Sequence, residues 1–124
     1  MGNIKSIEKV NFEYIQKHNN SVVLLNTLST QSQHCLIENS LHADEEEKSI
    51  NNLLYQNRNS EIIIYGKNYY DETCYKKYNQ LKQLGFKNVK LYLGGLFEWL
   101  CLQEIYGKDL FRTTSTENDI LKYK

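Results

Sequence analysis

Four short apolar runs are separated by stretches in which apolar residues recur at helical spacing. The runs lie at residues 21–26, 35–37, 61–65 and 88–93. Continuous apolar runs, as within 21–26 and 61–65, are typical of strands that are covered on both faces of a parallel sheet. The segment 88–93 instead alternates Val89, Leu91 and Leu93 with Lys90 and Tyr92, which also predicts a strand. We therefore predict a strand in each run, and the three consecutive isoleucines at 62–64 make the third run the strongest of them.

Helices are predicted between these strands. Residues 7–18 carry apolar side chains at intervals of three or four, which predicts a helix there. A second helix is expected to begin at Asp44 as its N-cap, with Glu47 at the capping-box position. A third is expected to start with Asp71 as its cap and to stop at Gly85.

The fourth predicted helix, at 96–102, is apolar on nearly every side, and Gly107 ends it. We expect such a helix to be deeply buried. Strands that alternate with helices predict an α/β fold with a mainly parallel central sheet flanked by helices. Ligands of such folds bind beyond the carboxyl ends of the strands. The loop that follows Tyr65 is therefore the first candidate for a functional site.

Composition excludes several classes of function. The 124 residues contain 15 Lys plus Arg and 15 Asp plus Glu, so we expect no nucleic-acid partner, because such binders carry a basic excess. The three cysteines have no paired spacing with one another or with the three histidines, so neither a disulfide framework nor a metal site is expected. A glycine-rich phosphate motif is missing, so no organic cofactor is expected. Free thiols indicate a reducing compartment, and we expect a cytoplasmic location.

The first six residues, MGNIKS, fit the pattern for N-myristoylation, with Gly2 as the acylated residue. One acyl chain binds a membrane only marginally, and no cysteine nearby could carry a second. The pattern therefore predicts at most a weak, reversible peripheral association with a membrane. The alternative is an ordinary chain terminus.

The loop after the third strand is a candidate anion-binding loop. A strand that runs through a tight loop into a helix presents backbone N–H groups and the positive end of the helix dipole. In this chain the lysine and the loop amides could hold an anion between two tyrosines. Alternatively, the lysine is solvated and the tyrosines cover hydrophobic edges. The loop residues are Gly66, Lys67, Asn68, Tyr69, Tyr70 and Asp71.

Cys74 is the cysteine nearest to this loop. It falls on the apolar stripe of the predicted helix, which favours a buried structural thiol. A helix N-terminus also favours the thiolate form, so Cys74 stays a candidate nucleophile.

Residues 61–99 resemble a rhodanese-like domain. Such domains have an apolar strand, an active-site loop, a helix that ends in Leu-x-x-x-Gly-Phe, an Asn-Val strand and a Gly-Gly-x-x-x-Trp turn and helix. The matching residues that follow the loop are Gly85, Phe86, Asn88, Val89, Gly94, Gly95 and Trp99. Residues 24–27 resemble the first strand of the family, although Asn26 replaces the usual Asp. The stretch 96–107 also resembles a subgroup of protist and giant-virus sequences.

The resemblance covers about residues 8–106. It divides the chain into an N-terminal segment, 1–7, a rhodanese-like domain, 8–106, and a tail, 107–124, that packs back onto the domain. Active rhodaneses carry the persulfide-forming cysteine directly after this strand, where Gly66 stands in this chain. Related phosphatase and arsenate-reductase variants need a loop Arg, but the only Arg after Gly66 is Arg112.

Two hypotheses follow from this departure. We favour a module without sulfurtransferase activity, which offers a binding or regulatory surface to an unknown protein partner. The alternative is an atypical thiosulfate sulfurtransferase in which Cys74, or else Cys35, carries the persulfide.

Overall fold

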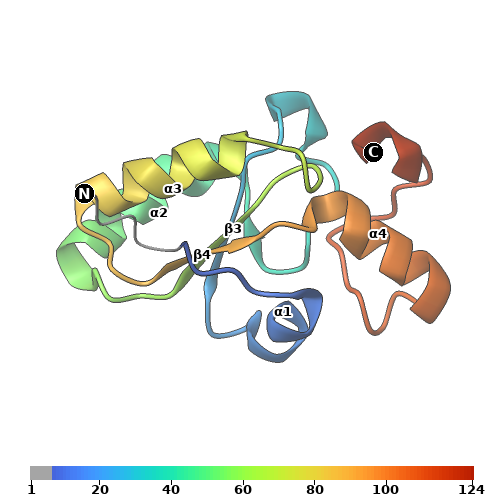
Figure 1. Cartoon of the computed structure of the whole chain (residues 1–124), viewed down its shortest axis with the longest axis horizontal. Coiled ribbons are helices and arrows are strands. Elements are labelled where there is room, and N and C mark those ends of the chain that lie inside the picture. The colour runs from blue at the N-terminus through green and yellow to red at the C-terminus, as the bar shows by residue number, and fades with distance from the viewer. Residues whose placement is uncertain (1–6) are drawn as a thin grey trace.

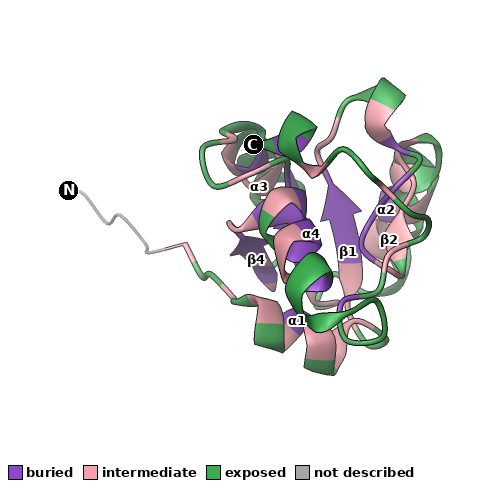
Figure 2. Ribbon diagram, turned by 90° about the vertical axis from the view of Figure 1, so that its right-hand side faces the viewer, coloured by how far each residue is buried: buried purple, intermediate pink, exposed green. Residues whose placement is uncertain are grey.

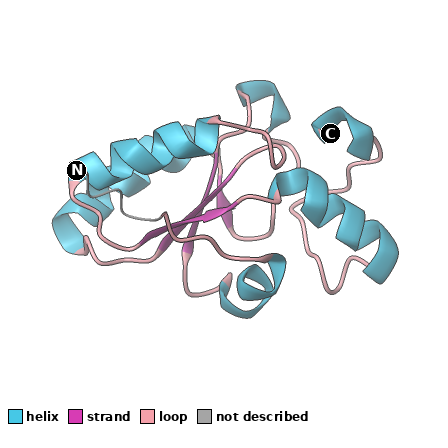
Figure 3. Ribbon diagram, viewed as in Figure 1, coloured by secondary structure: helices cyan, strands magenta, loops and turns pink. Residues whose placement is uncertain are grey.

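The computed structural model describes residues 7–124 and contains a four-stranded parallel sheet with the strand order β2-β1-β3-β4 (Figures 1 and 3). The strands are β1 (Val23–Asn26), β2 (Ser40–Leu41), β3 (Ile62–Tyr65) and β4 (Val89–Tyr92). The α-helices are α1 (Phe12–His18), α2 (Ala43–Gln56), α3 (Thr73–Leu84) and α4 (Gly95–Tyr106). Two short 3-10 helices are η1 (Thr30–Ser32) and η2 (Ile120–Tyr123). The predicted α/β class is confirmed.

Strand β3 forms the centre of the core, and all four of its residues are buried. Side chains of a strand alternate between the two faces of the sheet. Ile63 and Tyr65 therefore pack into one core cluster and Ile62 and Ile64 into the other. The three isoleucines therefore pack on both faces of the sheet, as expected for a strand that is covered on both sides.

Each face of the sheet is covered by two helices. Helices α1 and α4 cover one face through Ile15, Trp99 and Leu100, and η2 adds Tyr123 to the same cluster. Helices α2 and α3 cover the other face through Ile50, Cys74 and Leu81. Figure 2 shows the buried strand β1 behind α4, whose inner side is buried and whose outer side is exposed.

The N-terminal part of the first predicted helix is wrong. Helix α1 begins only at Phe12, where the side chain of Asn11 accepts a hydrogen bond from the N–H of Tyr14 at 3.0 Å. The preceding residues are extended beside β4: Val10 N–H donates to the carbonyl of Leu91 at 2.9 Å. Backbone pairing with the edge strand is therefore formed in place of another helical turn.

The predicted strand at 35–37 is also wrong. Ile37 forms only an isolated antiparallel bridge with Thr113, and the edge strand β2 lies further on, at Ser40–Leu41. Residues 35–37 are apolar because all three side chains are buried in the core. Burial alone does not distinguish a strand from an irregular segment.

The start of α2 and the burial of α4 differ from the prediction. Helix α2 begins at Ala43, and its N-cap is His42, whose Nδ1 accepts from the Asp44 N–H at 3.1 Å. Asp44 therefore lies in the first turn, where its charge still suits the helix dipole. Helix α4 is not buried all round, because Ile105 and Tyr106 in its last turn are 71% and 61% exposed.

The tail after α4 returns across the domain. Phe111 and Tyr123 are buried in the same core cluster as Trp99, and Trp99 Nε1 donates to the carbonyl of Arg112 at 3.0 Å. Over residues 7–124 the helices are too short or too polar to cross a membrane.

Candidate functional site

The loop 66–71 follows β3 at the carboxyl end of the sheet and lies against the first turn of α4. The carbonyl of Gly66 accepts from the N–H of Leu96, and that of Lys67 accepts from Phe97, both at 2.9 Å. Gly95 permits this approach, because a Cβ atom there would lie 2.8 Å from the Gly66 carbonyl oxygen. Its φ of +70° also favours glycine. Gly95 thus allows the first turn of α4 to hold the loop.

The carboxylate of Asp71 occupies the interior of this loop. Its Oδ2 accepts from the Lys67 N–H at 2.8 Å, and its Oδ1 accepts from the Thr73 N–H at 3.0 Å and the Thr73 hydroxyl at 2.6 Å. Burial acts to raise the pKa of Asp71, but these hydrogen bonds outweigh it and the pKa is lowered. The carboxylate is therefore ionised at neutral pH and holds amide groups that could otherwise bind an external anion.

Asn68 organises the rest of the loop. Its side-chain oxygen accepts from the N–H of Tyr70 at 2.9 Å, and its Nδ2 donates to the carbonyl of Tyr123 at 3.0 Å. The loop is thereby joined to the C-terminal tail. The side chains of Tyr69 and Tyr70 point outward and are 66% and 86% exposed.

The thiol of Cys74 lies under the loop, in the first turn of α3. A Cβ atom built on Gly66 would come within 2.9 Å of the Cys74 sulfur, whose hydrogen-bonding partner is the Thr27 hydroxyl at 3.7 Å. Cys74 is only 2% exposed. Burial raises the pKa of its thiol to about 11. Sequence and structure thus both place this cysteine on the buried stripe of the helix.

A polar cavity of about 370 Å³ opens beside the loop. Two lysines, Lys67 and Lys122, line it together with Asp71 and Tyr123, and Cys74 is not among its lining residues. Lys122 and Tyr123 come from the tail, so the pattern around β3 gave no signal that they would reach this site. Gly2, the predicted acylation site, lies outside the described residues.

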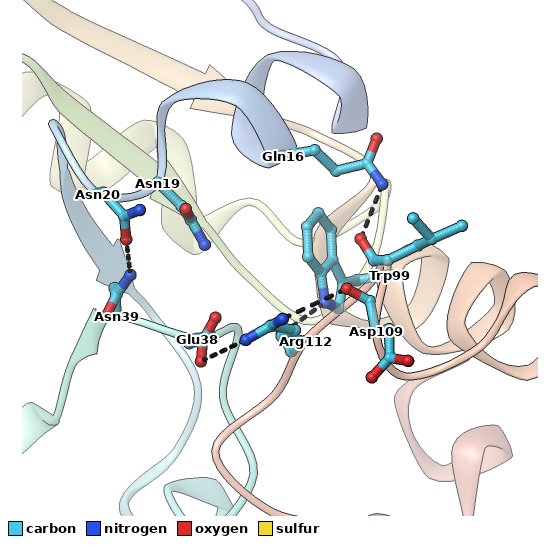
Figure 4. Close-up of a pocket in the computed structure, with 9 residues that line it drawn as sticks. Gln16, Asn19, Asn20, Glu38, Asn39, Trp99, Asp109 and Arg112 are labelled. Atoms are coloured by element: carbon cyan, nitrogen blue, oxygen red, sulfur yellow. Dashed lines mark hydrogen bonds and ion pairs between the residues drawn. The ribbon is translucent and has the colours of Figure 1, made fainter.

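A second polar cavity, of about 430 Å³, lies at the amino end of β1 and β2 (Figure 4). Several of its polar side chains are paired within the chain. Asn39 donates to Asn20 at 2.7 Å, and Gln16 donates to the carbonyl of Leu110 at 2.7 Å. Ligands of parallel α/β folds bind at the opposite, carboxyl end of the strands, so the loop is the better candidate site.

The fold and this loop together define a class: a parallel α/β domain with a candidate site at the carboxyl end of the inner strand β3. The chain belongs to the rhodanese-like domain family, whose model, described as "Rhodanese-like domain", matches residues 11–101. A comparison with curated proteins gives no match.

Solved structures support the fold. The NMR structure of the rhodanese-like domain of the Anabaena sp. protein Alr3790 has a TM-score of 0.63 at 17% identity, covering 90% of this chain and 81% of that chain. A crystal structure of Alr3790 has a TM-score of 0.61 at 16% identity, with coverages of 91% and 86%. A variant of EanB in complex with hercynine has a TM-score of 0.56 at 16% identity. That match covers 80% of this chain and 27% of EanB.

Proposed function

We propose that this rhodanese-like domain lacks sulfurtransferase activity and acts as a binding or regulatory module for a protein partner. The observation that carries the proposal is the internal carboxylate: Asp71 fills the loop in which a sulfurtransferase would hold its nucleophile and an anionic substrate. Gly66 provides no thiol at the end of β3. Thiosulfate would also meet the negative charge of Asp71 there.

The chemistry of Cys74 supports the same conclusion. Transfer of sulfane sulfur begins with attack by a thiolate, and the thiol form is not the nucleophile. Burial raises the pKa of Cys74 to about 11, so at neutral pH the group is overwhelmingly in the thiol form. The sulfur is also buried, and Cys74 does not line the cavity beside the loop.

The alternative, an atypical thiosulfate sulfurtransferase that uses Cys74, is favoured by one observation. The Cys74 sulfur lies 2.9 Å from the Cβ position of residue 66, so this thiol is close to the place where the family carries its nucleophile. Reaction there requires the loop to open and the Asp71 carboxylate to leave.

The experiment that separates the two functions is thiocyanate formation from thiosulfate and cyanide. We expect the wild-type protein, Cys74→Ser and the control Cys101→Ser to give the same background rate. Turnover by the wild-type protein that Cys74→Ser abolishes and Cys101→Ser preserves would establish the alternative function.

We further propose that the N-terminal segment is acylated at Gly2 and gives the module a weak, reversible contact with cytoplasmic membranes. Support comes from the MGNIKS pattern alone. Co-expression with an N-myristoyltransferase should add the mass of one myristoyl group, and Gly2→Ala should prevent the addition. An unmodified wild-type chain under these conditions would contradict the proposal.

A further inference from the structure

A largely apolar cavity of about 630 Å³ lies on the outer flank of the loop. It opens between the loop, the end of β4 and the first turns of α4. It shares no lining residue with the polar cavity beside Asp71. The size is within the range of about 300–1,000 Å³ that is usual for small-molecule sites.

Four aromatic side chains line this cavity. Tyr69 and Tyr70 stand at its rim with their ring planes at 89° and their centroids 5.7 Å apart, so the two rings form perpendicular walls. Tyr92 and Phe97 line it from β4 and α4. The two rim tyrosines are largely exposed, so their rings are accessible to a ligand in the cavity.

One carboxylate, that of Glu98, lies in the same cavity. Tyr92 donates its hydroxyl to Glu98 Oε1 at 2.7 Å, and burial together with Glu98 raises the pKa of Tyr92, so the donor proton stays in place. The carboxylate folds back over Gly94, where any Cβ atom would overlap it. Glycine at that position therefore makes room for the charge.

The negative charge of Glu98 has no cationic partner within residues 7–124: no ammonium or guanidinium nitrogen of this part lies within 4.0 Å of its oxygens. Lys124 also lines the cavity but makes no ion pair with Glu98; both side chains are exposed, so solvent partly screens both charges. The cavity thus combines apolar aromatic walls with one unneutralised carboxylate.

We propose that this cavity binds a small quaternary ammonium compound. The negative faces of aromatic rings attract cations, and such rings are the usual receptors for methylated ammonium groups. The methyl groups of the ligand suit the apolar walls, while its charge suits Glu98. A metal ion would need several oxygen ligands, and a neutral apolar ligand would gain nothing from the carboxylate.

This site goes beyond the proposed function and does not depend on it, because Cys74 and Asp71 do not line the cavity. Binding of choline can be followed through the backbone amide signals of the cavity residues in NMR titrations. The matched ligand is the neutral analogue in which carbon replaces the charged nitrogen. Sodium chloride at equal ionic strength controls for salt effects.

We expect choline to give saturable shifts around the cavity and the neutral analogue to bind more weakly. Glu98→Gln removes the charge but keeps an oxygen that accepts from Tyr92, and Tyr70→Leu removes one wall. Tyr70→Leu should weaken binding by about 2- to 30-fold, the range expected for a cation–aromatic contact. Glu98→Gln should also weaken binding, because it removes the charge that attracts the ligand. Tyr55→Leu, which alters an 89% exposed tyrosine on α2, should leave binding unchanged.

Shifts that fail to saturate would overturn the proposal, and so would equal binding of choline and its neutral analogue. Unchanged binding in both Glu98→Gln and Tyr70→Leu would also overturn it. Amide shifts on the far side of the sheet show whether each variant is folded, so a loss of binding can be told from a loss of structure.

Discussion

The thiol sulfur of Cys74 lies 2.9 Å from the position at which a side chain of residue 66 would begin. The space under the loop is therefore already filled, by this sulfur and by the carboxylate of Asp71, whose Oδ2 would lie 2.5 Å from the same Cβ atom. Glycine at position 66 and its two neighbours form one packed arrangement. A cysteine at position 66 would therefore force the side chains of Cys74 and Asp71 to move.

Restoring the cysteine alone should fail. We expect Gly66→Cys to lower the free energy of unfolding by about 1–3 kcal/mol, because the new Cβ would also press on Thr27 Oγ1 at 2.8 Å. Thiocyanate formation should stay at background. Chemical denaturation measures the first effect, and Gly66→Ala separates the steric cost from the effect of the thiol. A variant as stable as wild type, with turnover, would contradict this packing.

Asp71 should stabilise the loop through its charged hydrogen bonds. We expect Asp71→Ala to lower the free energy of unfolding by about 1.5–3 kcal/mol and to speed amide exchange at Lys67 and Thr73. Asp109→Ala is the matched control, since the Asp109 carboxylate makes no hydrogen bond or ion pair with the described chain, residues 7–124. Equal exchange rates in the two variants would show that Asp71 does not hold the loop.

Trp99 should be a major part of the core. Its side chain is 1% exposed and packs edge-on against Phe111 at a centroid distance of 5.1 Å. We expect Trp99→Ala to cost about 3–5 kcal/mol of unfolding free energy. Ile105→Ala, in the exposed last turn of the same helix, should change stability by no more than about 0.5 kcal/mol. A similar loss of unfolding free energy in both variants would mean that α4 does not bury the face that carries Trp99.

Glu117 should make the domain sensitive to acid. A hydrogen bond from Lys122 is the main cause that lowers its pKa to about 2; burial opposes this shift, and bonds from His34 and Tyr123 add to it. The unfolded value is about 4.3, so the stabilisation is present above that pH and is lost as the pH falls towards 2.

Unfolding by denaturant at a series of acidic pH values measures this dependence. Glu117→Gln should lower stability at neutral pH and flatten the loss below about pH 4. Glu104→Gln, at an exposed carboxylate on α4 with no hydrogen bond or ion pair to residues 7–124, should leave the pH profile unchanged. An identical acid profile for wild type and Glu117→Gln would contradict the role of this carboxylate.

The spacing of apolar residues in the sequence correctly predicted those helices and strands that bury one or both of their faces in the core. The isoleucines of β3 and the stop at Gly85, with its φ of 105°, are local signals that packing reinforces. The helix predicted at residues 7–10 was wrong because these residues pair with β4, a segment some 80 positions further along the chain. A local sequence pattern carries no information about such a distant partner.

The sequence predicted a loop between β3 and α3 but not the arrangement of side chains inside it. The prediction that Asp71 is the N-cap of α3 was wrong, because the helix begins at Thr73 and its N-cap is Glu72, whose side chain makes no capping hydrogen bond. Asp71 lies one residue earlier, where one of its oxygens accepts from the N–H of Thr73. Its second oxygen binds the N–H of Lys67, and this depends on the turn that the loop makes against Gly95. The carbonyl of Tyr123 reaches Asn68 of the loop because of the path that the tail takes across the domain. The sequence of the tail did not predict this path.

The central claim is that the loop of this rhodanese-like domain is closed by its own carboxylate above a neutral, buried thiol. The most direct test is the mass of each cysteine peptide after the folded protein has been incubated with thiosulfate. We predict an unmodified Cys74 peptide, whereas the same treatment of an active rhodanese adds one sulfur atom to its nucleophile. A single added sulfur on Cys74 in the folded wild-type protein would contradict the account.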